Sequence, residues 1–142
     1  MIIKLKSKIK PTEDENKVIK AVKNIFKDAK IVVEDNYLVG ESKDISRFKE
    51  LLRSQAILDT ARMVLERGIN GNLTKFYLNK QAAFAGLVNF DRDIHGGIFV
   101  KLIAEEDEDL MKIIKDIAPK TKNGKIIDED EDTDESEINK KN

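Results

Sequence analysis

The chain has 142 residues and a mass of 16.2 kDa, which suits one domain with a core of its own. It contains no cysteine, no tryptophan and one histidine, which excludes disulfide scaffolds, thiolate metal sites and cysteine nucleophiles. The formal net charge of −1 combines +5 on residues 1–127 with −6 on residues 128–142, and no long apolar block or targeting segment occurs, so we expect a cytoplasmic protein.

The first element is a strand, because apolar and small residues alternate with lysines from Ile3 to Lys10 before Pro11 ends the pattern. A helix is predicted over 13–27, opened by a capping box between Thr12 and Glu15. The segments 31–34 and 37–40 are typical of a hairpin that turns at Asp35 and Asn36, two residue types that tolerate a positive φ.

A long helix is predicted over 44–67, with Gly68 as its end. Its apolar residues lie on one side in the first half and on another side in the second half. A helix with two apolar sides is usually covered on both. Two explanations are open, namely a sheet together with later segments of the same chain, or a sheet together with a partner subunit.

The remaining elements are strands over 74–79, 87–90 and 98–104 and a helix over 107–117. The segment 98–104 is apolar on both faces, which is typical of a central strand. This order predicts an α+β fold, with a mostly antiparallel sheet and helices packed on one face. We expect a single domain over 1–120 and a flexible acidic tail over 121–142, because so acidic a segment buries too little apolar surface to become ordered.

Signatures of catalysis are nearly absent, so no enzymatic activity and no cofactor are expected. The one cluster that could bind a divalent cation is Asp91, Asp93 and His95 in a single loop. A polar hairpin loop closed by Gly96 and Gly97 explains the same residues, and no further ligand can be argued, so we expect no metal.

Basic residues offer a stronger signal, since clustered lysine and arginine can contact phosphates. Taken singly, each of them is explained better by a solvated surface or by protection of a sheet edge. Tyr37, Tyr77, Phe76 and Phe84 could stack on unpaired bases, although Phe76 and Phe84 suit a core better. The candidate RNA-binding residues are Lys4, Lys6, Lys8, Arg53, Arg67, Lys75 and Lys80.

Two blocks carry a family resemblance, RSQAILDTAR over 53–62 and NKQAAFAG over 79–86. They resemble an archaeal protein family that is grouped with predicted RNA-binding, exosome-associated proteins and has a fold similar to the 5S-RNA-binding ribosomal protein of the large subunit. The resemblance implies a homodimer and RNA binding. Within it, the helix residues also suit a structural or interface role, because ion pairs at helical spacing can connect them. These residues are Gln55, Asp59, Arg62 and Glu66.

The leading hypothesis is therefore a cytoplasmic homodimer that binds structured RNA, such as ribosomal RNA, through lysine and arginine contacts to phosphates. The alternative is a dimeric interaction or assembly module with no nucleic-acid ligand. Abundant Lys, Glu and Ile, with few Gln and no Cys, also indicate a thermostable protein.

Overall fold

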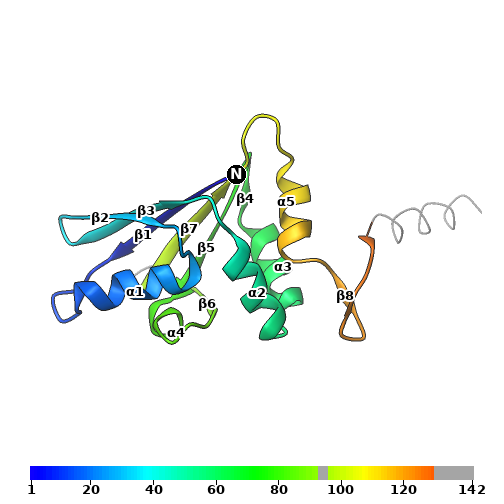
Figure 1. Cartoon of the computed structure of the whole chain (residues 1–142). Helices are drawn as coiled ribbons and strands as arrows, with labels where there is room; N and C mark the ends of the chain where they lie inside the picture. Colours follow the sequence, from blue (N-terminus) through cyan, green and yellow to red (C-terminus); the bar gives the residue numbers. More distant parts are fainter. Residues whose placement is uncertain (93–95, 130–142) are drawn as a thin grey trace, which may run out of the picture.

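The computed structural model describes residues 1–92 and 96–129. Within these ranges, helices cover one side of a seven-stranded sheet in the order β2-β3-β1-β7-β5-β4, with β6 beside β5 (Figure 1). The strands of this sheet are β1 (Ile2–Lys8), β2 (Lys30–Glu34), β3 (Tyr37–Ser42), β4 (Ile69–Asn70), β5 (Leu73–Asn79), β6 (Phe90–Asp91) and β7 (Gly97–Ile103). The helices are α1 (Glu15–Ile25), α2 (Ser46–Ser54), α3 (Leu58–Arg67), α4 (Lys80–Phe84) and α5 (Leu110–Ile117). Every pairing between the strands is antiparallel, so the predicted α+β class is confirmed.

The N-terminal elements follow the predicted order. In β1 the even-numbered lysines point to solvent, while Ile3 and Leu5 are almost fully buried beneath the helices. The turn between β2 and β3 falls at Asp35 and Asn36, with φ of 50° and 64° as predicted. The capping box was wrong, because α1 starts after Asp14, whose side chain accepts a hydrogen bond from the N–H of Asn16.

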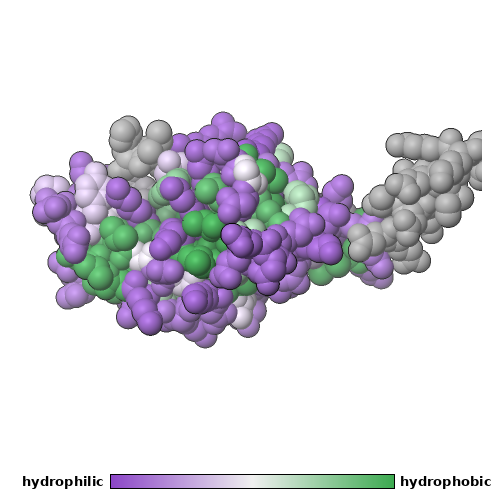
Figure 2. All heavy atoms as spheres, turned by 90° about the horizontal axis from the view of Figure 1, so that it is seen from above, coloured by the Kyte–Doolittle hydropathy of each residue, from purple (hydrophilic) through white to green (hydrophobic). Residues whose placement is uncertain are grey.

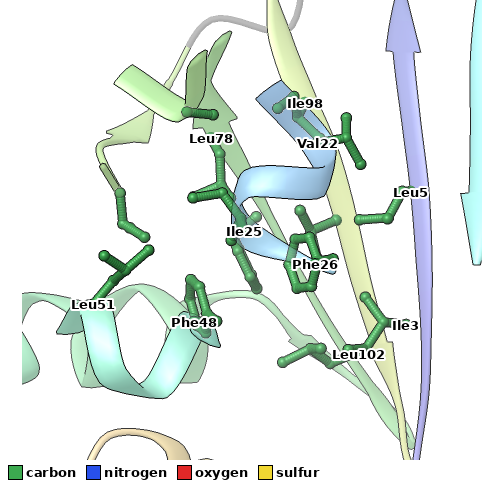
Figure 3. Packing of buried hydrophobic residues seen from close by; sticks show 14 of the residues in the cluster. Ile3, Leu5, Val22, Ile25, Phe26, Phe48, Leu51, Leu78, Ile98 and Leu102 are labelled. Carbon is green, nitrogen blue, oxygen red and sulfur yellow. The ribbon is translucent and has the colours of Figure 1, made fainter. Parts of the chain in front are cut away.

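The core lies between the sheet and the helices, and aromatic rings form its centre (Figure 3). The rings of Phe26 and Phe76 lie on either side of Phe48, with centroids 6.1 and 5.6 Å from that of Phe48. Phe90 meets Phe76 and Phe48 edge-on. The end of α1, α2 and the strands β5 and β6 are therefore joined through one aromatic cluster.

The long helix expected over 44–67 is two helices, α2 and α3, so that prediction was wrong. Ala56 has a φ of 56°, and two hydrogen bonds close the end of α2, from the N–H of Ile57 to the Leu52 carbonyl at 3.0 Å and from Ala56 to Arg53 at 3.1 Å. This is the Schellman arrangement, in which glycine usually takes the left-handed position. Because alanine takes it here, the sequence shows no helix-breaking residue. The apolar residues of the predicted helix change side halfway along it, and this change marks the position at which α2 ends and α3 begins.

Gly68 does follow the last residue of α3, but its φ of −82° lies in the ordinary helical region. A Cβ at this position would lie 2.1 Å from the carbonyl oxygen of Lys75. Glycine is needed because β5 passes so close to the end of the helix, and not because of a left-handed conformation.

Within the described residues, later segments of the same chain cover the second apolar side. Ala61 and Leu65 of α3 are fully buried, and α3 contacts both β5 and α5. A small hairpin, β8 (Thr121–Lys122) with β9 (Lys125–Ile126), follows α5 at the start of the segment expected to be a tail. Residues 127–129 of that segment are also described, and 130–142 lie outside the described residues.

Further elements differ in detail from the prediction. In place of the strand expected over 87–90, the structure has only the two-residue strand β6, Phe90–Asp91. The short helix α4 was not predicted. β7 is central, as predicted, but only one of its faces is fully apolar, because Lys101 lies on the other face beside Phe99, and both are only partly buried. No helix among the described residues is long and apolar enough to cross a bilayer.

Candidate functional site

The side of the sheet that carries no helix presents the side chains of alternate residues from β1, β7 and β5, and we call it the open face. Lys4 of β1 lies opposite Lys101 of β7, which in turn lies opposite Lys75 of β5. Neighbouring strands are about 4.8 Å apart, so three lysine residues share one row across three adjacent strands. Such a row concentrates positive charge on a flat surface.

At the β1 end of the row, an acidic residue neutralises part of this positive charge. Lys4 also faces Glu41 of β3, and the two form an ion pair at 3.2 Å between half-exposed side chains. Lys101 and Lys75 have no ion pair within the described residues. The centre and the β5 end of the row are therefore the most available to an external anion.

The next row combines a lysine with two aromatic rings. Lys6 lies opposite Phe99, and Phe99 lies opposite Tyr77. The Phe99 and Tyr77 ring centroids are 5.0 Å apart, with an angle of 36° between the planes. The Lys6 ammonium lies 4.8 Å from the Tyr37 ring centroid, within the range of a cation–π contact.

The alternating pattern of β1 explains why this surface stays open. Its apolar positions fill the core, so its lysines must all point to the opposite side. Covering that side would desolvate a series of ammonium groups, which is costly without partners. In the view of Figure 2, apolar patches are interrupted by hydrophilic residues.

The seven candidate RNA-binding residues separate into different environments. Lys4, Lys6, Lys8 and Lys75 are exposed on the open face. Lys80 is only 8% exposed, and its ammonium donates hydrogen bonds to the Lys8 carbonyl and to Glu13 Oε1, the latter at 2.9 Å. This arrangement gives Lys80 a structural role, because it ties α4 to the end of β1.

The electrostatics of Glu13 agree with that role. Burial raises the pKa of its carboxyl, but hydrogen bonds from the Lys10 N–H and the Lys80 ammonium outweigh burial and hold the pKa below its usual value. Glu13 is therefore ionised at neutral pH, and the charge of Lys80 is neutralised inside the protein.

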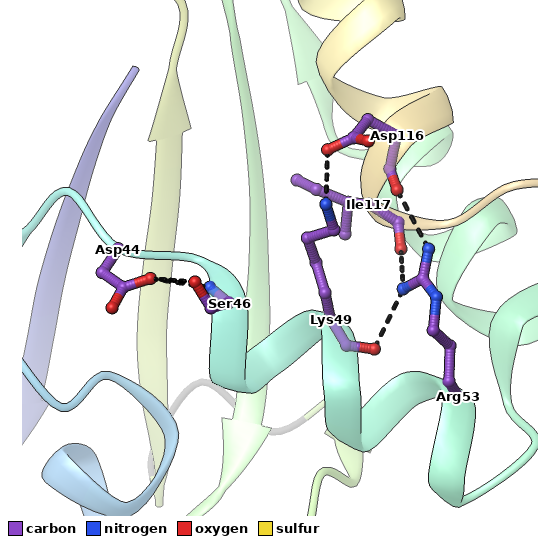
Figure 4. A network of polar contacts seen from close by, with 6 residues as sticks. All are labelled: Asp44, Ser46, Lys49, Arg53, Asp116 and Ile117. Atoms are coloured by element: carbon purple, nitrogen blue, oxygen red, sulfur yellow. Dashed lines mark hydrogen bonds and ion pairs between the residues drawn. The ribbon is translucent and has the colours of Figure 1, made fainter.

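Arg53 binds the end of α5 (Figure 4). Its guanidinium donates to the carbonyls of Asp116 and Ile117, at 3.2 and 3.3 Å, and to that of Lys49 on its own helix at 3.0 Å. The Lys49 ammonium adds an ion pair to Asp116 at 2.7 Å. Carbonyls at a helix C-terminus attract cations, so this geometry favours a capping role for Arg53.

Arg62 is buried, with a side chain only 6% exposed. Its guanidinium donates to the Ala118 carbonyl at 2.8 Å and to Glu66 Oε1 at 2.7 Å, and it forms a two-atom contact with Glu129. The hydrogen bond from Arg62 lowers the pKa of the Glu129 carboxyl despite the opposing effect of burial. These contacts hold the segment that follows α5 against α3.

The other proposed structural residues also bind within the chain. The Gln55 amide pairs with the backbone of Val88, donating to its carbonyl and accepting from its N–H, both at 2.8 Å. Asp59 accepts a hydrogen bond from Thr121 at 2.9 Å instead of pairing with Arg62. Arg67 is exposed at the end of α3, away from the lysine row.

The cation cluster considered for Asp91, Asp93 and His95 falls partly outside the described residues, because 93–95 are not among them. In the described part of the chain, no group of three or more acidic or histidine side chains is placed to hold a metal.

Sequence reasoning missed Phe99 and Lys101, which belong to the open face. Their segment was interpreted as apolar on both faces, although Lys101 interrupts it. If β7 had been placed between β1 and β5, whose Lys4 and Lys75 point outward, the row of three lysines would have been identified.

Comparisons with known proteins identify the family to which the chain belongs. A family model described as RNA binding matches residues 2–105, which include every strand of the main sheet. A UPF0201 protein of Methanocaldococcus jannaschii is 61% identical over 136 residues, covering 92% of this chain and 80% of that protein. A crystal structure of a UPF0201 protein from the same organism, at 59% identity, has a TM-score of 0.86 and covers 90% of this chain and all of that one.

A longer relative is also known. A UPF0200/UPF0201 protein of Archaeoglobus fulgidus is 40% identical over 129 residues, and the match covers 89% of this chain but 40% of that protein.

Proposed function

Because the chain belongs to the archaeal UPF0201 family, whose matching model is described as RNA binding, we propose that it binds RNA through the open face. The observation that carries this proposal is the row of Lys4, Lys101 and Lys75 across three adjacent strands. Ammonium groups in such a row can contact successive phosphates of an RNA backbone. Lys6 and Lys8 add two more exposed lysines on β1, beside the row. The protein acts as a binding module and catalyses no reaction.

The first experiment measures binding of a structured RNA hairpin to the full chain at several salt concentrations. Phosphate contacts release counterions, so affinity should fall steeply as salt rises. Replacing Lys6, Lys75 and Lys101 by Gln should lower the slope of log K against log salt by about 2–3, since each contact contributes roughly 0.7–0.9.

A matched control removes three lysines from the opposite side of the molecule. Lys20, Lys23 and Lys27 belong to or follow α1 and are exposed. Replacing these three by Gln changes net charge equally but should leave the slope nearly unchanged. Equal effects of the two triple variants, or binding that salt does not weaken, would refute the proposed site.

The proposal also includes a homodimer, and the free edge of β2 supports it. Within the described residues β2 pairs only with β3. Its sequence, KIVVE, is complementary to itself when two copies run antiparallel about Val32, because Lys30 of each copy then faces Glu34 of the other. Val32 is 56% exposed, and the Val32 of the other copy would shield it partly from water.

A single cysteine tests this interface, because the chain has none of its own. In a symmetric pair, the two copies of Val32→Cys face each other and should form a disulfide under mild oxidation. Met63→Cys, at a 44% exposed position on α3, is the matched control and should remain uncrosslinked. A monomer by sedimentation, or faster crosslinking through position 63, would rule out pairing through β2.

The alternative function, an interaction or assembly module without a nucleic-acid ligand, needs the dimer but not the lysine row. It predicts that the hairpin RNA does not bind even at low salt, whereas the RNA proposal predicts salt-dependent binding in the same titration.

A further inference from the structure

We propose that the aromatic pair Tyr77 and Phe99 is a stacking subsite for an unpaired nucleotide of the RNA. This inference rests on the proposed function and refines it, because it states which form of RNA the open face selects. The pair belongs to the strands but not to the core, whose aromatic cluster lies on the opposite side of the sheet. Two partly buried rings in contact therefore remain accessible on a surface that carries no helix.

The rings border a shallow hollow of about 290 Å³. This is close to the lower limit for small-molecule sites, roughly 300 Å³, and suits a single base better than a larger ligand. The hollow crosses β3, β1, β7 and β5, and its lining residues are Lys6, Ser7, Lys8, Tyr37, Tyr77, Gly97 and Phe99.

Two features of the hollow suit a flat aromatic ligand. Gly97 lines the hollow beside Phe99 and contributes no side chain that would fill it. The Ser7 hydroxyl is turned into the protein and donates to the Gly97 carbonyl at 3.1 Å. That carbonyl is thus already satisfied, and the base meets mainly ring faces and backbone.

Charge around the hollow sets the expected direction of the phosphates. Lys6 and Lys8 border it on β1, and the Lys101 ammonium lies 5.5 Å from the Phe99 ring centroid. On the other side, Asp91 of β6 pairs with Tyr77 and accepts a hydrogen bond from Asn79 at 3.4 Å. A stacked nucleotide should therefore direct its phosphates toward β1 and away from β6.

This geometry discriminates between forms of RNA. In an A-form duplex the base faces are stacked on one another, so rings on a protein surface cannot reach them. Unpaired nucleotides expose those faces, and stacking on aromatic side chains is how many single-strand-binding proteins hold them. The open face should therefore prefer unpaired segments, such as loops and single strands, over a duplex with the same number of phosphates.

The test compares the full chain with two RNA probes, a twelve-nucleotide single strand of uridines and a blunt duplex with the same number of phosphates. We expect tighter binding of the single strand. The double variant Tyr77→Leu, Phe99→Leu should weaken single-strand binding about 5- to 140-fold, because base–aromatic stacking contributes about that much per base, and should leave duplex binding almost unchanged. The matched control is Phe84→Leu, an exposed ring on α4 outside the hollow, which should bind the single strand normally.

A second measurement needs no variant. The chain has two tyrosines and no tryptophan, and both tyrosines border the hollow, so stacking should quench the intrinsic tyrosine fluorescence when the single strand binds. Equal affinity for the two probes, or single-strand binding that neither quenches tyrosine nor responds to the double variant, would overturn the stacking subsite and leave phosphate binding intact. Failure of both probes to bind at low salt would overturn the proposed function itself.

Discussion

Replacing Arg62 by methionine removes the most buried cation in the described part of the protein and is expected to destabilise it strongly. Methionine keeps much of the volume of the aliphatic stem. The substitution leaves the Ala118 carbonyl and the Glu129 carboxylate without the donor that they share. Breaking a buried ion pair costs about 3–5 kcal/mol, because the remaining charge stays poorly solvated.

The structure narrows that range. Glu66 is 44% exposed, so its pair with Arg62 contributes little, about 0.3–0.5 kcal/mol as for other pairs four residues apart on a helix. Glu129 has a side chain only 12% exposed and contributes most of the loss, although it can gain some solvation by moving outward. We therefore expect a decrease of about 3 kcal/mol in the free energy of unfolding.

Guanidinium unfolding of the wild type, Arg62→Met, Glu129→Gln and the double variant gives the coupling energy between the two side chains. The coupling should exceed ~1 kcal/mol, and the same cycle with Glu66→Gln is the matched control, which should give less than about 0.5 kcal/mol. A loss below ~1 kcal/mol for Arg62→Met, or equal coupling to both glutamates, would refute this reasoning.

The pH dependence follows from the same contact. Arg62 lowers the pKa of Glu129 from its ordinary value of 4.5, so the stabilisation is complete above that value and is lost as the pH falls through the lower, folded-state pKa. The stability difference between the wild type and Arg62→Met should therefore shrink on acidification from neutral pH to below about pH 4.

Three further changes test other contacts. Ala56→Gly should raise the free energy of unfolding by up to ~1 kcal/mol, because glycine adopts the φ of 56° without strain, and a lower melting temperature would contradict this. Gly68→Ala should lower the free energy of unfolding by more than ~1 kcal/mol, since its Cβ would lie 2.1 Å from the Lys75 carbonyl oxygen, and unchanged unfolding would show that the backbone adjusts freely. Deleting 130–142, which carries a charge of −4, should raise RNA affinity in low-salt titrations if these acids compete with phosphate, whereas unchanged or weaker binding would exclude competition.

Local patterns in the sequence were sufficient to predict the elements whose burial repeats regularly. The alternation in β1 and the Asp35–Asn36 turn are visible within ten residues, because strand period and turn chemistry are local properties. The break between α2 and α3 could not be identified from residue types, since alanine is the strongest helix former and yet occupies the left-handed position. In the sequence, the break was indicated only by the change in the side of the helix on which the apolar residues lie.

The environments of the charged candidates depend on contacts between residues that are distant in the chain. The sequence could therefore not show which candidates are exposed and which are held inside the protein. Lys80 meets Glu13 across 67 positions, and Arg53 reaches the end of α5 across more than 60. Lysine is rarely buried, so exposure was the reasonable expectation for Lys80. The lysines of β1 were assigned to the surface correctly, because their exposure follows from the period of their own strand.

The composition of the open face also favours one class of partner over another. A folded protein that covered this face would have to desolvate Lys6, Lys75 and Lys101, and lysine is depleted in the centres of protein interfaces for that reason. A polyanion avoids this cost, because each phosphate supplies the countercharge for the ammonium group that it meets while both remain largely hydrated. The rings of Tyr77 and Phe99, which adjoin those lysines, offer the apolar contact that bases can use and phosphates cannot. A surface with this combination of cations and rings therefore fits a nucleic acid better than a protein partner.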